Sequence, residues 1–257
     1  MLTRPDHILR CPPGNPRYSG ANPEAHGTRM HSADREVKAS HALTVSDLHA
    51  LREAISPARM GTYLRRAGYN SRRAVELYAW NVRAAAALLP VLQANEVALR
   101  NAVNAALVSQ FGAAWPYSQG FLRALPKHDS GAFQRERGKV EKRLGLREVS
   151  TGDVVASQTY WYWVAMLTSR YEDRVWNREF RRSFPHAPRG VTRQVVHDRA
   201  ETIRKLRNRI AHHEPLLSFD LLGSYNRAVA IVRWISPAKA AWVQREWPPA
   251  RELIFQP

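Results

Sequence analysis

The sequence predicts an all-α protein built as an antiparallel helical bundle, and three observations lead to this prediction. Apolar residues recur at three- and four-residue steps along most of the chain, which is the spacing of one buried helix face. Serine, threonine and proline stand where helices would begin. No sustained alternation of β-branched and polar residues predicts a strand. With 257 residues, the chain is long enough to bury a sizeable core.

Three segments are expected along the chain. Residues 1–41 hold five prolines and three glycines among few apolar residues, which predicts a disordered N-terminal tail. A true start at Met30 would give the residues before it the same appearance. Residues 42–247 form the predicted helical domain, and a C-terminal tail of residues 248–257 begins with two prolines.

In the first half of the domain, start and stop signals delimit each expected helix. Thr44 or Ser46 can cap a short helix, and Ser56, followed by proline, begins the next. Pro90 is expected to break or kink a long apolar helix, and Gly112 suits its C-terminal end. The helices expected here are residues 46–55, 57–67, 71–89 and 91–110.

The middle of the domain is expected to start irregularly at Trp115 and to continue as a basic helix. Arginine and lysine alternate with glutamate over residues 135–147, which favours a solvated helix, with RNA contact as the alternative. Ser150 looks like the cap of the following helix, and a short basic helix is expected over residues 176–184.

Four adjacent aromatic residues occupy positions 160–163. On a helix such residues point in all directions, so most of them are expected in the core or in a subunit interface. Stacking on nucleic-acid bases is the alternative for any that remain exposed.

A helix before Pro215 carries the most unusual polar cluster of the chain. Thr192 can cap its start, and Pro215 disfavours its continuation. The helix is therefore expected to end near His213 or Glu214, with His212 and His213 in its last turn. Its predicted buried face consists of Val196, Ala200, Ile203, Leu206 and Ile210. After Pro215, helices are expected from about residue 219 to 235 and from 237 to 247.

The chemistry of this cluster suits a phosphodiester. Arg207 offers a rigid fork of donors to a phosphate. A helix C-terminus favours a cation, which makes His212 a candidate proton donor, while the alternative is a histidine that only caps the helix. Asn208 and His212 lie one turn apart, whereas Arg207 lies at the edge of the apolar stripe, away from His212. The two could serve one ligand if the helix loosens before Pro215, or if a second copy of the chain completes the site.

These residues also carry a resemblance. Arg207 and His212, with a polar residue after the arginine, resemble the motif of the HEPN superfamily of small helical ribonuclease domains. The segment 206–216 is more specifically similar to the Abi-like (abortive infection) family. Further similar segments are 56–64, 77–81, 95–101 and 234–237, so the resemblance covers roughly residues 43–245.

The resemblance implies a HEPN-type bundle with additional helices, acting as a homodimer on an RNA substrate in phage defence. It implies Arg207, Asn208 and His212 as catalytic residues, with His213 as the spare candidate. In HEPN domains a polar residue of the facing helix orients the arginine, so Glu96 or Asn101 could take that role here. The alternative for Glu96 is an ordinary surface pair with Arg100, four residues on. Expected RNA contacts are Arg204, Lys205 and Arg209.

The composition narrows the possible binding partners and cellular compartments of the protein. A net charge of +17, with only six lysines among 39 basic residues, would attract a polyanion such as nucleic acid, although arginine-rich usage can also reflect genome composition. The single Cys11 places the protein in a reducing compartment, and no apolar run reaches about 18 residues, so a cytoplasmic protein without a membrane span is expected.

The His213–Leu217 segment lacks the second histidine of a zinc hydrolase, and nucleotide-binding glycine loops are absent. No cofactor and no metal are expected.

The chemistry of the motif and the resemblance together predict a metal-independent endoribonuclease for single-stranded RNA. The resemblance implies that it acts in defence or in toxin-like growth arrest, with an antitoxin or RNA partner to restrain it. The alternative is a non-catalytic RNA- or protein-binding module of the same fold. Catalysis would require in-line attack of a 2′-hydroxyl, charge stabilisation by Arg207 and proton transfer by His212.

Overall fold

The structure, a computed structural model, describes residues 43–145 and 149–257. The predicted tail of residues 1–41, with Cys11 and Met30, lies outside the described residues. The chain divides into two units, Met1–Ala50 and Leu51–Pro257. Helix α2 (Val45–Ile55) begins in the first unit, where the Asp47 amide donates to the Thr44 hydroxyl at 3.1 Å, so Thr44 rather than Ser46 caps it.

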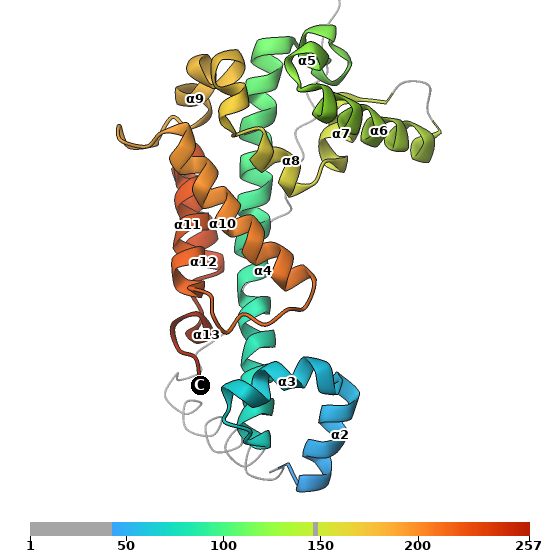
Figure 1. Cartoon of the computed structure of the whole chain (residues 1–257). Helices are drawn as coiled ribbons and strands as arrows, with labels where there is room; N and C mark the ends of the chain where they lie inside the picture. Colours follow the sequence, from blue (N-terminus) through green and yellow to red (C-terminus); the bar gives the residue numbers. More distant parts are fainter. Residues whose placement is uncertain (1–42, 146–148) are drawn as a thin grey trace, which may run out of the picture. The chain divides into compact units, whose positions relative to one another are not determined.

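The second unit is helical, and no strand occurs among its described residues, which confirms the all-α prediction (Figure 1). Its elements are α3 (Pro57–Arg66), α4 (Ser71–Phe111), the 3₁₀ turn η1 (Trp115–Tyr117), α5 (Gln119–Ala124), α6 (Lys127–Leu144), α7 (Thr151–Ser157), α8 (Tyr160–Ala165), the 3₁₀ turn η2 (Ser169–Tyr171), the π-helix η3 (Glu172–Trp176), α9 (Asn177–Ser183), α10 (Arg193–Ala211), α11 (Leu221–Ile235), α12 (Pro237–Glu246) and α13 (Arg251–Ile254).

The long helix α4 runs without interruption through Pro90, where a break or kink was expected. Proline removes one backbone donor, but Leu88, Val91 and Leu92 on either side of it are fully or almost fully buried, so tertiary packing offsets the loss. The predicted stop at Gly112 is confirmed: its φ is 87° and its amide donates to the Val108 carbonyl.

By length and composition α4 is also apolar enough to cross a membrane. Of its most apolar window, 44% is buried inside the protein, and core helices of soluble proteins pass the same test of length and composition.

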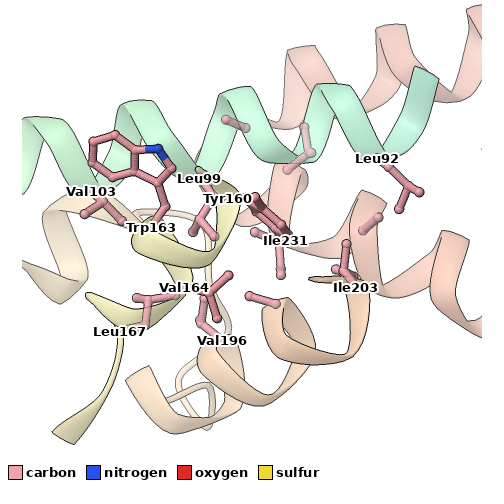
Figure 2. Packing of buried hydrophobic residues seen from close by; sticks show 14 of the residues in the cluster. Leu92, Leu99, Val103, Tyr160, Trp163, Val164, Leu167, Val196, Ile203 and Ile231 are labelled. Atoms are coloured by element: carbon pink, nitrogen blue, oxygen red, sulfur yellow. The ribbon is translucent and has the colours of Figure 1, made fainter. Parts of the chain in front are cut away.

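Helices α10 and α11 form the rest of the central packing. Helix α11 packs against α4, α10 and α12, while α10 also packs against α8 (Figure 1). Figure 2 shows the core where these helices meet, with Leu92, Leu99 and Val103 of α4, Tyr160, Trp163 and Val164 of α8, Val196 and Ile203 of α10, and Ile231 of α11. All five residues predicted for the buried face of α10 are at most 6% exposed.

Two segments differ from the sequence prediction. The region from Trp115, expected to be irregular, forms η1 and α5, because Trp115 and Phe121 are buried and in edge-to-face contact. The expected C-terminal tail carries α13, and Leu253 is buried. The Trp80 indole donates to the carbonyl of Glu252 at 3.0 Å, which anchors this segment on α4.

Candidate functional site at the end of helix α10

Helix α10 ends earlier than expected. Its last residue is Ala211, and His212 is the C-cap, so both histidines follow the helix instead of forming its last turn. The His213 amide donates to the Ile210 carbonyl at 3.0 Å, and the Glu214 amide donates to the Arg209 carbonyl at 2.8 Å. These two bonds form a Schellman motif, in which the residue at the position of His213 takes a left-handed conformation. Its φ is indeed 55°, at a position where glycine is the usual residue.

The segment after the motif is held by side chains from three helices. The buried Asn81 of α4 accepts a hydrogen bond from the Leu216 amide at 2.7 Å. Arg59 of α3 donates to the His213 carbonyl at 2.9 Å, and Arg209 of α10 donates to the Pro215 carbonyl at 3.1 Å. The backbone of the motif is therefore fixed, although His212 and His213 themselves are exposed.

Arg207 lies opposite a carboxylate of α4. Its Nε is 3.5 Å from Oε2 of Glu96, and the two side chains are 41% and 25% exposed. Among the described residues, no ion pair joins Glu96 to Arg100, the alternative that the four-residue spacing had left open. Glu96 thus occupies the place expected of a residue that orients Arg207, whereas Asn101 is exposed and makes no such contact.

A buried hydrogen-bond network, which the sequence did not predict, lies directly beside Glu96. Asn95 is 0% exposed, its Oδ1 accepts from the Tyr160 hydroxyl at 2.7 Å, and its Nδ2 donates to the Ala228 carbonyl at 3.0 Å. Burial raises the pKa of Tyr160, so its hydroxyl stays protonated and donates. The network joins α4, α8 and α11, and it fixes the position of Glu96 next along the chain. An asparagine within the apolar face of a long helix was the signal that could have revealed it.

The remaining motif residues are accessible. Asn208 is half-buried, and its carbonyl accepts the His212 amide at 2.9 Å. Within the described part of the chain, no side chain bonds the imidazole of His212. No hydrogen bond or ion pair of the described residues joins Arg207 to His212 either. The structure thus brings Arg207 to Glu96, and it places His212 on the exposed backbone that follows the helix.

The three expected RNA contacts differ in their surroundings. Arg204 donates twice to Glu201, at 2.6 and 2.7 Å, and its side chain is only 20% exposed. Arg209 holds the Pro215 carbonyl and lies over the ring of Phe219. Lys205 has a side chain that is 65% exposed, so it is the most accessible of the three cations.

The Glu201–Arg204 pair is the clearest electrostatic feature of α10. The hydrogen bonds from Arg204 hold the pKa of Glu201 below its ordinary value, and the same bonds raise the pKa of Arg204. Both groups are therefore charged over the whole physiological range of pH.

An apolar groove of about 600 Å³ adjoins the motif. Val82 and Leu89 of α4 are each 50% exposed in it, and His213 and Glu214 form its other side. The part of the chain that the structure describes contains no cluster of three or more histidine, cysteine, aspartate or glutamate side chains suited to a metal ion.

Comparisons of the chain with protein families, with curated proteins and with solved structures found no match.

Proposed function

We propose that the chain is a metal-independent endoribonuclease that cleaves single-stranded RNA at the end of α10, in phage defence or growth arrest. The observation that carries the proposal is the Arg207–Glu96 pair. A partly exposed guanidinium is oriented by a carboxylate of the facing helix, five residues before an exposed histidine. The similarity of segment 206–216 to Abi-like proteins of the HEPN superfamily supports the same function.

The pair leaves Arg207 able to bind a phosphate. Its contact with Glu96 involves Nε at 3.5 Å, which is long for a charge-assisted hydrogen bond. The terminal guanidinium nitrogens, which have no hydrogen-bond or ion-pair partner among the described residues, are then the donors that would reach phosphate oxygens.

In the proposed reaction, the ribose 2′-oxygen attacks the adjacent phosphorus while the bond from phosphorus to the 5′-oxygen breaks. The products are a 2′,3′-cyclic phosphate and a 5′-hydroxyl end. His212 takes the proton of the 2′-hydroxyl and returns a proton to the leaving 5′-oxygen. Arg207 stabilises the charge that develops on the phosphate, and Asn208 positions the phosphate or the imidazole. His213 is the substitute for His212.

A homodimer remains part of the proposal. Arg207 and His212 of one chain are not in contact, and the exposed Val82 and Leu89 beside His213 form an apolar surface that a second copy could cover. Two motifs would then line one basic cleft.

The decisive experiment measures cleavage of a single-stranded RNA oligonucleotide in excess chelator, together with RNA affinity. His212→Ala should lower the cleavage rate about 10²- to 10⁴-fold and leave RNA affinity nearly unchanged, because imidazole contributes proton transfer more than binding. Arg207→Ala should weaken both, since a phosphate contact is lost as well. His186→Ala, an exposed histidine outside the motif, is the matched control and should behave like the wild type.

The second candidate, a binding module without catalysis, gives a different pattern. RNA would be bound but not cleaved, His212→Ala would change nothing, and Arg207→Ala would act only through affinity. Activity that disappears in chelator and returns with a divalent ion would contradict the metal-independent mechanism.

A further inference from the structure

Trp161 differs from the other residues of the aromatic segment. Tyr160 and Trp163 are at most 3% exposed and belong to the core, as expected for most of these residues. Trp161 is 55% exposed. An exposed tryptophan on the surface of a basic protein offers a flat apolar face to a ligand.

Trp161 forms part of two adjoining hollows. The first has a volume of about 270 Å³, and its walls are mainly apolar and aromatic, with Phe133, Tyr162 and Tyr171 among them. Two carboxylates, Asp129 and Glu136, also line it. The Tyr162 hydroxyl is buried and has no hydrogen-bond partner among the described residues, so a polar group of a ligand could satisfy it.

The second hollow, of about 180 Å³, is more polar than the first. It shares Trp161 and Asp129 with the first, and it adds Arg170, His197 and the carboxylate of Glu201. Arg170 lies 3.1 Å from Asp129, and its side chain is 63% exposed. A mainly apolar hollow is thus joined to a more polar hollow, in which Arg170 and His197 stand beside two carboxylates.

We propose that these two hollows together bind one nucleotide. Its base would stack on Trp161 in the first hollow, and its phosphate would lie near Arg170 and His197 in the second. A base presents apolar faces and an edge with amino groups, for which the carboxylates Asp129 and Glu136 are suitable acceptors. A volume of about 270 Å³ is slightly below the range of about 300–1,000 Å³ that is usual for drug-sized ligands, which suits a single base.

The nucleotide can be free or part of an RNA strand. His197 and Glu201, which line the second hollow, lie on the same face of α10 as Arg204 and Asn208, because the steps between them are four, three and four residues. His197 and Asn208 are about 16 Å apart along the helix axis. A strand bound at Arg207 could therefore reach Trp161, and in this form the inference rests on the proposed function. For a free nucleotide it does not.

The test is calorimetric titration of the full chain at low salt, first with the four ribonucleoside 5′-monophosphates and then with a 2′-O-methylated, non-cleavable RNA oligonucleotide. Trp161→Ala should weaken binding roughly tenfold, because loss of base stacking costs affinity of this order. Trp242→Ala, a tryptophan of α12 that is 43% exposed, is the matched control and should change affinity less than twofold. Ribose 5-phosphate, which lacks the base, should bind the wild type and the Trp161→Ala variant equally weakly.

The outcomes separate the two sources of nucleotide. Trp161-dependent binding of a mononucleotide supports a site for free nucleotide. Trp161-dependent binding of the oligonucleotide alone supports a site for RNA. Binding that never depends on Trp161, or an organic amine such as tryptamine that binds there while no nucleotide does, overturns the inference.

The same titration with Arg207→Ala separates this inference from the proposed function. Mononucleotide binding should persist in that variant because the two sites use different residues. RNA cleavage without any nucleotide binding at Trp161 would overturn only the inference, whereas nucleotide binding by a protein that does not cleave RNA would overturn only the proposed nuclease.

Discussion

The two ends of α10 hold their arginines in opposite ways. Near the N-terminus, Arg193 is 7% exposed, donates to Glu172 at 2.9 and 3.1 Å, and also bonds the Leu167 carbonyl. Near the C-terminus, Arg207 is 41% exposed and has a single carboxylate at 3.5 Å. The first arginine has its donors occupied inside the fold, while the second keeps donors directed at solvent.

This difference indicates which arginines of a strongly basic chain stabilise the fold and which are available to bind a ligand. A guanidinium with several short hydrogen bonds contributes to the structure, and losing it leaves buried acceptors without partners. A guanidinium that is oriented by one loose ion pair contributes little to stability, so a ligand can engage it at small cost. Three predictions test the contrast, in order of decreasing effect.

The largest effect is expected at the buried end. Arg193→Ala should lower the free energy of unfolding by about 2–3 kcal/mol, since it removes charge-assisted bonds to Glu172 and the Leu167 carbonyl. Arg207→Ala is the comparison and should cost less than about 1 kcal/mol. Urea denaturation of the two variants measures both values. Equal losses would mean that Arg207 is as structural as Arg193.

A smaller change in the free energy of unfolding, of opposite sign, is expected at the exposed C-terminal end of α10. His213→Gly should raise the free energy of unfolding by about 0.5–1 kcal/mol, because glycine adopts a φ of 55° without the strain of a side chain. His212→Gly is the matched control: its φ is −94°, where glycine only adds conformational entropy to the unfolded chain, so stability should fall. Thermal or urea unfolding compares the two. A loss of stability in His213→Gly would show that the imidazole makes stabilising contacts that outweigh the strain.

The smallest effect depends on pH. Arg204 lowers the pKa of Glu201 in the folded protein below the ordinary value of 4.5. The contribution of the Glu201–Arg204 pair to the stability of the fold is therefore complete above about pH 4.5. It is lost as the pH falls through the lowered pKa of Glu201 in the folded protein. Glu201→Gln should cost about 0.3–0.5 kcal/mol at pH 7, and this difference from wild type should shrink toward pH 3.

Glu53→Gln is the control for the pH experiment, since Glu53 is exposed and has no ion-pair partner among the described residues. Its difference from wild type should stay near zero at every pH. A Glu201→Gln difference that does not vary with pH would show that the charge of Glu201 is irrelevant to the pair.

Local signals predicted much of the fold. Ser56 caps α3 and Gly112 ends α4 as expected, because capping depends on residues that are neighbours in sequence. Pro90 misled the prediction, since its cost is local while the packing that offsets it is not. The end of α10 was placed two or three residues too late, because Pro215 was taken as the stop although the chain turns earlier, at His213.

The candidate site was predictable only in part. The Arg207–His212 spacing marked the motif, and the resemblance pointed to Glu96 or Asn101 as facing residues. Only the structure shows that Glu96 and not Asn101 faces Arg207, because the choice depends on how α4 is rotated about its axis relative to α10. The sequence pattern could not predict that Trp161 is exposed while most of its aromatic neighbours are buried, because four adjacent aromatic residues define no single helix face.

Helix α4 has one more consequence for the candidate site. Asn81 binds the segment after the motif, and Asn95 binds residues of α8 and α11 beside Glu96. Both ends of the site are therefore positioned by side chains of the same helix. The 14 residue steps from Asn81 to Asn95 span about 21 Å and return to nearly the same face. A single inserted residue between them would turn one asparagine about 100° away from its partner. Homologous chains that keep this site should therefore differ in length in their loops, but not between positions 81 and 96.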